Sequence, residues 1–104
     1  MAAYWIAHVT VLDPHNYQNY MSLAPAAFAQ YGARFLARGG PSVTLEGQEL
    51  QRHVVIEFED FATAQACYHS EAYQQAKAQR DGCCSAHIVI VDGIASLEAP
   101  VPRQ

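Results

Sequence analysis

Hydrophobic and polar positions alternate in four short segments of the chain, and each of these segments predicts a β-strand. The first runs from Tyr4 to Val11 (YWIAHVTV) and is rich in aromatic and β-branched residues. The others are ARFLARGG, which stops at paired glycines, HVVIEF, and SAHIVIVDG, which closes at Gly93. We therefore predict four strands.

A helix is predicted between the first two strands. Asp13 followed by Pro14 is typical of a helix start, because the aspartate side chain can accept hydrogen bonds from free backbone N–H groups. Proline fits the first helical position, because the backbone N–H that it lacks would have no partner there. Apolar residues then recur on one helical face as far as Gly32, which ends the helix. Because Pro25 lacks a backbone donor, we expect it to kink or split this helix near Met21.

A second helical region is predicted between the last two strands. Asp60 and Ser70 each fit a helix cap, so we expect two short helices separated by a break at His69. The turn-prone pair Glu46-Gly47 lies between the second and third strands and makes them hairpin neighbours. Arg52 flanks the same hairpin, and we expect its proximity to Glu46-Gly47 to lock the loop.

The resulting order, βαββαβ, is typical of a ferredoxin-like α+β fold with a four-stranded antiparallel sheet and helices on one face. We expect a single domain over residues 1–95. The last residues, 96–104, include the proline-rich APVPRQ and are expected to form an extended tail.

Strand parity divides the strand residues between the two faces of this sheet. The more apolar set is expected to face the helices: Trp5, Ala7, Val9, Val11, Phe35, Ala37, Val54, Ile56, Phe58, Ala86, Ile88 and Ile90. The opposite set is mixed: Tyr4, Ile6, His8, Thr10, Arg34, Leu36, Arg38, His53, Val55, Glu57, His87, Val89 and Val91. Because an apolar centre with a polar rim is typical of an interface, we expect a homodimer in which two such faces stack.

Several landmarks together resemble a known family. They are Asp13-Pro14 with Tyr17 and Tyr20, GARFLARGG at 32–40, Glu46-Gly47, IEF at 56–58, YHSEAY at 68–73, and Arg80. In this order they resemble the proteins known as domain of unknown function 1330, of the dimeric α+β barrel (ferredoxin-like) superfamily. The chain departs from the usual pattern at Gly32-Ala33 and at Asp92-Gly93. The resemblance implies a sheet-to-sheet dimer but no catalytic residue, since the superfamily includes cofactor-free monooxygenases, isomerases, haem enzymes and ligand-binding modules.

Composition and charge narrow the classes of partner. The formal net charge of −4 has the wrong sign for binding a phosphate backbone, so nucleic acid is not expected. No apolar run is long enough to span a membrane, and the first residues do not form a signal peptide. The three cysteines fit no disulfide framework, which favours a reducing, cytoplasmic location.

Ionisable residues on the mixed face are the first candidates for chemistry. If the first and third strands were parallel neighbours, His8 and Glu57 would approach and could act as a general-base pair. Arg38 and His53 are candidate ligand-binding residues on the same face. The alternative, which we favour, is an interface network in which Arg38 pairs with Glu57. No metal or cofactor is predicted, because the histidines lack a metal-binding spacing.

A tyrosine cluster is the second candidate. Tyr17, Tyr20 and Tyr68 fall near the layer between helices and sheet, where such residues most often form core. They would otherwise line a cleft for a small aromatic or carbonyl compound. This leaves two functions open: a cofactor-independent monooxygenase-like or isomerase-like enzyme, or a non-catalytic dimeric module that binds a ligand or partner.

Overall fold

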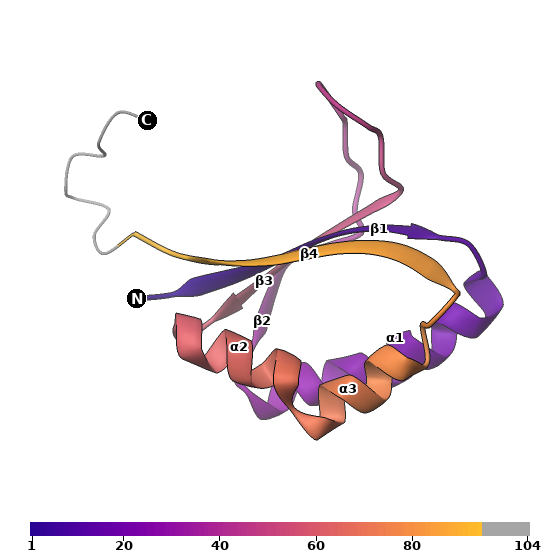
Figure 1. Ribbon diagram of the computed structural model, residues 1–104. Coiled ribbons are helices and arrows are strands. Elements are labelled where there is room, and N and C mark those ends of the chain that lie inside the picture. Colours follow the sequence, from indigo (N-terminus) through magenta and orange to yellow (C-terminus); the bar gives the residue numbers. More distant parts are fainter. Residues whose placement is uncertain (95–104) are drawn as a thin grey trace.

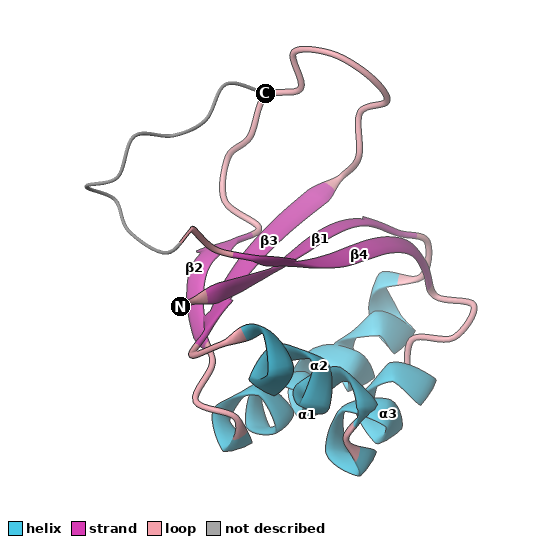
Figure 2. Ribbon diagram, turned by 60° about the vertical axis from the view of Figure 1, so that its left-hand side comes forward, coloured by secondary structure: helices cyan, strands magenta, loops and turns pink. Residues whose placement is uncertain are grey.

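An antiparallel four-stranded sheet carries three helices on one face and none on the other (Figures 1 and 2). This computed structural model describes residues 1–94, so the predicted tail at 96–104 lies outside the described residues. The elements follow the chain as β1 (Ala3–Val11), α1 (Pro14–Gln30), β2 (Arg34–Arg38), β3 (Arg52–Phe58), α2 (Phe61–His69), α3 (Glu71–Ala78) and β4 (Cys84–Asp92). No helix within residues 1–94 is long and apolar enough to cross a lipid bilayer.

The sheet has the strand order β2-β3-β1-β4, and every neighbouring pair is antiparallel. This confirms the predicted ferredoxin-like α+β fold. The loop between β2 and β3 rises from the sheet on the side away from the helices (Figures 1 and 2). We call the helix-free side the open face.

The predicted start of α1 is confirmed. The Asp13 carboxylate accepts a hydrogen bond from the Asn16 backbone N–H at 3.2 Å, and Pro14 is the first helical residue. The expectation that Pro25 would split the helix is wrong, since α1 continues through it to Gln30. Ala24 and Phe28, on either side of the proline, are buried against the same core, so packing holds both halves in one helix.

The predicted break between α2 and α3 is also confirmed. Ser70 has an extended backbone, and its hydroxyl accepts from the Tyr73 N–H at 3.1 Å and donates to the Cys67 carbonyl at 2.7 Å. The Ser70 side chain therefore satisfies the Cys67 carbonyl near the end of α2 and the Tyr73 N–H at the start of α3. Asp60 caps α2 through the Thr63 N–H at 2.7 Å.

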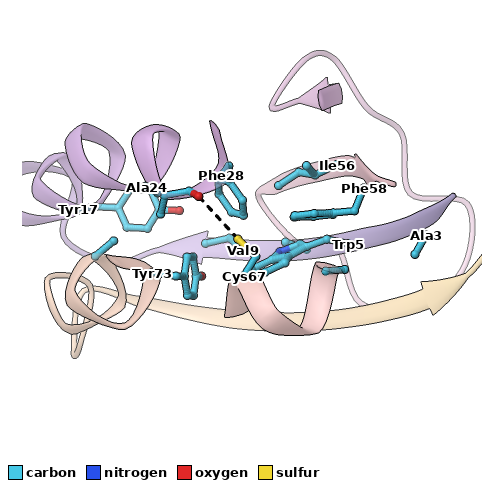
Figure 3. Close-up of a cluster of buried hydrophobic side chains, with 14 of the residues drawn as sticks. Ala3, Trp5, Val9, Tyr17, Ala24, Phe28, Ile56, Phe58, Cys67 and Tyr73 are labelled. Carbon is cyan, nitrogen blue, oxygen red and sulfur yellow. Dashed lines mark hydrogen bonds between the residues drawn. The ribbon is translucent and has the colours of Figure 1, made fainter. Parts of the chain in front are cut away.

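Aromatic rings from both layers form the core (Figure 3). The Trp5 ring lies 5.0 Å from the rings of both Phe28 and Tyr73 and is stacked on Phe58 at 6.0 Å. All four side chains are buried. These contacts tie β1 and β3 to α1 and α3, so they fix the helix layer on the sheet.

A β-bulge in β2 changes one part of the predicted parity. Phe35 pairs with Ile56, but the next registered pairs are Ala37 with Val55 and Arg38 with Val54. The extra residue, Leu36, shifts everything after it to the opposite face. Ala37 therefore lies on the open face and Arg38 on the helix face, which reverses both predicted placements.

The core predicts a strong effect for one substitution. Phe28→Ala removes a ring in contact with Trp5, Phe35 and Tyr73, and we expect it to lower the free energy of unfolding by about 3–5 kcal/mol. Urea denaturation measures this. Phe61→Ala, at a ring that is 40% exposed, is the control and is expected to cost less than about 1 kcal/mol. Equal losses in the two variants would contradict the packing described here.

Candidate functional site

A pocket opens between the sheet and α1 at the end of the sheet where β1 and β2 finish and β3 and β4 begin. Its cavity volume is about 50 Å³, and the pocket is open to solvent at its mouth. Apolar side chains from all four strands form one wall, and α1 forms the other with its two tyrosines, Tyr17 and Tyr20. Tyr17 and Tyr20, two of the predicted ligand-binding residues, thus both line this pocket, and their role in binding stays a prediction.

Three arginines also line the pocket: Arg38, Arg52 and Arg80. They come from the end of β2, the start of β3 and the turn after α3. Arg52 pairs with Val9, whose side chain is buried beneath the helices, so Arg52 belongs to the helix face. Arginine stays charged in proteins, so the pocket concentrates positive charge among apolar and aromatic side chains.

A chain of hydrogen bonds links one of these arginines to Tyr20. The Arg80 guanidinium donates to the Tyr73 hydroxyl at 3.3 Å, and the hydroxyls of Tyr73 and Tyr20 are 3.0 Å apart. Because Tyr73 is fully buried, its own proton has an acceptor only in Tyr20 among the described residues. Burial of Tyr73 thus favours the donor order from Arg80 to Tyr73 to Tyr20, and the hydrogen-bonded chain ends at Tyr20, a residue of the pocket wall.

Burial keeps the pocket tyrosines protonated. It raises the pKa of Tyr20 well above the ordinary tyrosine value, and the adjacent Tyr73 hydroxyl adds to this effect. Burial raises the pKa of Tyr17 in the same direction. Both hydroxyls are therefore donors at neutral pH, and neither is a general base.

Arg52 is held against the backbone of the β2–β3 loop. A Cβ atom built on Gly39 would lie 2.6 Å from Nη1 of Arg52, so the guanidinium occupies space that only glycine leaves free. Gly39 also has a positive φ of 69°, which favours glycine, and its N–H donates to the His53 carbonyl at 2.9 Å. The expected lock between Arg52 and Glu46 is absent among the described residues.

The pocket has no acidic group to balance its arginines. No Asp, Glu or His is among its lining residues. Within residues 1–94 the only salt bridge joins Arg34 and Glu57, on the open face, at 2.7 Å. The arrangement can therefore bind and stabilise negative charge, but it offers no side chain that would take a proton.

Tyr68 does not belong to this pocket. Its ring lies 5.7 Å from Trp5 and 5.4 Å from Tyr73, and it borders a separate shallow hollow with Phe61 and His69. Tyr68 therefore packs against the aromatic core and does not line the pocket.

The remaining predicted residues lie on the open face. The register places His53, His8 and His87 in one row across three strands, and Nδ1 of His8 is 2.8 Å from Nδ1 of His53. One of these two nitrogens donates and the other accepts, so the pair shares a single proton. Arg38, His8 and His53 also border a hollow beneath the β2–β3 loop.

Glu57 is not brought to His8. Because β1 and β3 are antiparallel, Glu57 lies opposite Tyr4. Tyr4 is four residues from His8, and at the usual rise per residue this separates the two by about 13 Å along β1. Its partner is Arg34 rather than the expected Arg38. The assumption of parallel strands was wrong, and the predicted general-base pair is not assembled within one chain.

Sequence reasoning underestimated Arg52 and Arg80. Arg52 lies two residues before Val54, so its parity already placed it on the helix face, but the nearby turn suggested a loop contact instead. Arg80 carries no periodic signal, because it lies in the turn after α3. Within residues 1–94, no group of three or more His, Cys, Asp or Glu side chains is arranged to hold a metal ion.

Solved structures with the same fold include proteins of known and unknown function. RPA0582 of Rhodopseudomonas palustris, a protein of unknown function, is 13% identical with a TM-score of 0.73 and matches over 91% of this chain and 84% of its own. A dimeric ferredoxin-like protein of unknown function from Jannaschia sp. CCS1 is 16% identical with a TM-score of 0.61, over 89% and 100%. SnoaB of Streptomyces nogalater, a cofactor-independent oxygenase, is 11% identical with a TM-score of 0.59, over 94% and 98%. At these identities the likenesses concern the fold alone.

The sequence comparisons agree with the structural ones. A search of curated proteins found no match to the chain. The family model described as a domain of unknown function, DUF1330, matches residues 2–94, nearly the whole chain. The chain therefore belongs to the DUF1330 family.

Proposed function

We propose that the pocket binds a small ring-bearing carbonyl or phenolic compound and stabilises its enolate or phenolate form. The observation that carries this proposal is the hydrogen-bonded chain from Arg80 through Tyr73 to Tyr20, a residue of the pocket wall. Donors aimed at a developing oxyanion are the commonest way in which proteins stabilise one. The flat apolar and aromatic walls suit a ring system, and the arginines favour the ionised form.

An enolate is the common intermediate of the two enzyme classes considered. In an isomerase-like reaction, a proton leaves one carbon and returns to another. In a cofactor-independent monooxygenase-like reaction, the carbanion reacts with O2, and a CH2 group becomes C=O while the second oxygen atom leaves as water. Both need the same pocket chemistry, and the fold shared with the oxygenase SnoaB supports the second.

The lack of a base in the pocket limits which compounds suit it. The candidate bases His8 and Glu57 are on the other side of the sheet, so in this proposal they do not touch the ligand. The substrate must then be acidic enough to lose its proton to water once bound. The non-catalytic alternative, a module that binds the anion without changing it, is favoured by the same observation.

We propose that the open face forms a homodimer interface. Ile6, Val55 and Val89 form an apolar row between the histidine row and the Arg34–Glu57 pair. Val89 and Val91, on the edge strand β4, are 54% and 45% exposed and extend this apolar surface. Solved relatives in fold are described as dimeric. In this arrangement His8 and Glu57 serve the interface.

We propose further that the protein acts in the cytoplasm. Cys67, Cys83 and Cys84 are all free thiols in the structure. Burial raises the pKa of the Cys67 thiol to about 11, so this thiol stays protonated and unreactive at neutral pH. Three unpaired cysteines in so short a chain are typical of a reducing compartment.

A naphthol titration tests the pocket chemistry. The absorbance of 2-naphthol distinguishes its neutral and ionised forms, and we expect saturating protein to lower its apparent pKa by about 1, a tenfold preference for the anion. Tyr20→Phe removes the hydroxyl at the end of the hydrogen-bonded chain and should abolish most of this shift. Tyr31→Phe, which lies outside the pocket, is the control. A bound naphthol with an unchanged pKa would refute the proposal.

Turnover separates the enzyme from the binding module. Deuterium incorporation at the α-carbon of 2-tetralone in D2O, followed by NMR, reports enolate formation, and oxygen uptake reports oxygenation. Exchange that slows at least about tenfold in Tyr20→Phe supports the enzyme. Saturable binding with no exchange and no oxygen uptake supports the binding module.

A charge placed on the open face tests the dimer. Light scattering after size exclusion should give twice the 11.4 kDa chain mass for the wild type. Val89→Asp should give a folded monomer, because two buried carboxylates would oppose each other or remain unpaired. Leu45→Asp, in the loop and 85% exposed, is the control and should stay dimeric. A wild-type monomer at micromolar concentration would exclude this interface.

A further inference from the structure

We propose that the ligand carries a carboxylate besides its ring and oxyanion, and that Arg38 and Arg52 bind this carboxylate at the mouth of the pocket. This inference rests on the proposed function of the pocket and names the class of compound: a ring-bearing hydroxy or oxo acid. The donor chain from Arg80 to Tyr20 would hold one oxygen of the ligand, and the two strand arginines would hold the acid group.

The two arginines are neighbours because of the bulge in β2. Arg38 pairs with Val54, and Arg52 precedes Val54 by two residues on the same face of β3. If the five residues of β2 paired regularly, without the bulge, Arg38 would lie opposite His53 and point to the open face. The fold therefore brings two guanidiniums to one corner of the pocket from adjacent strand ends.

Each guanidinium is positioned before any ligand binds. The Arg38 guanidinium carbon lies 4.3 Å above the centre of the Phe35 ring, and that ring is itself packed against Phe28 at 5.6 Å. The Arg52 guanidinium lies against Gly39, whose missing Cβ leaves it room. A side chain held in place loses less entropy when it binds an anion, so this arrangement suits recognition.

The charge balance at this corner calls for an anion. Two guanidiniums from adjacent strands repel each other, and among residues 1–94 neither forms a salt bridge. Arg80 is already engaged with Tyr73 and the Tyr20 ring, so it belongs to the other part of the pocket. The planar guanidinium fork matches the planar carboxylate, which can accept from both arginines at once.

A matched pair of ligands tests this inference. The probes are 6-hydroxy-2-naphthoate and 6-hydroxy-2-naphthamide, which share the ring and the hydroxyl and differ only in the charge of the second group. Calorimetry at pH 7.5 should show the acid binding at least about tenfold more tightly than the amide. The preference should weaken as salt is raised, because the site is open at its mouth.

Two pairs of variants test whether Arg52 causes the preference for the acid over the amide. Arg52→Gln should reduce the affinity for the acid to that for the amide and leave the amide unchanged. Arg34→Gln, an equal loss of charge on the exposed open face, should alter neither. Gly39→Ala should weaken acid binding by displacing Arg52, whereas Gly47→Ala, which also places alanine at a positive φ but meets nothing within 4 Å, should not. Circular dichroism confirms that each variant is folded.

The outcomes separate this inference from the proposed function. Equal affinity for acid and amide would overturn the carboxylate site while leaving the naphthol pocket intact. An equal loss of acid binding in Arg34→Gln and Arg52→Gln would also overturn it, because the effect would then come from overall charge. Failure of 2-naphthol and both probes to bind would overturn the proposed function itself.

Discussion

The antiparallel register of β1 against β3 and β4 is the constraint on which the rest of the molecule depends. With Trp5 opposite both Ile56 and Ile90, every second residue of the central strand faces the helices. The residues between them face the other way, so His8 necessarily meets His53 and His87. A slip of one residue would exchange the two sets, placing imidazoles in the core and an indole on the surface. Burial of the Trp5 ring therefore selects the register, and the register in turn selects both surfaces.

The two faces carry different kinds of polar chemistry. On the helix side, arginine and tyrosine donors surround an aromatic-walled pocket with no acid among its lining residues. On the open face, the charges of Arg34 and Glu57 are already paired, and two histidines satisfy each other. Groups that satisfy each other are typical of structural contacts, whereas donors left free are typical of binding sites. This contrast is why we propose the pocket, and not the histidine row, as the ligand-binding site.

Local patterns predicted most of the fold because their causes are local. Alternation identified the strands, and the caps at Asp13, Asp60 and Ser70 marked the helix starts with side chains that bond within three residues. The effect of Pro25 was wrongly predicted because proline destabilises a helix locally, whereas the packing that stabilises α1 involves residues distant in the sequence. Pro25 shows that tertiary packing can outweigh the low helix propensity of a single residue.

The site was predicted only in part, since it depends on which segments meet. Tyr17 and Tyr20 followed from helical spacing, but their partner Tyr73 is more than fifty residues away along the chain, and no pattern connects them. The pairing of His8 with Glu57 failed because it assumed that the first and third strands are parallel neighbours, whereas β1 and β3 are antiparallel. Arg38 was placed on the wrong face because a bulge leaves no reliable mark in a single sequence.

That bulge has an evolutionary consequence. Loss of the single codon for Leu36 would turn β2 into a regular edge strand and leave Ala37 opposite Val55 and Arg38 opposite Val54, so the Arg38 charge would stay on the helix face. Edge strands tolerate such changes better than central ones, because only one neighbour must adjust. A related chain could therefore lose this residue and keep the arginine on the helix face, whereas a chain that kept all five residues of β2 but paired them without a bulge would carry that arginine on the open face.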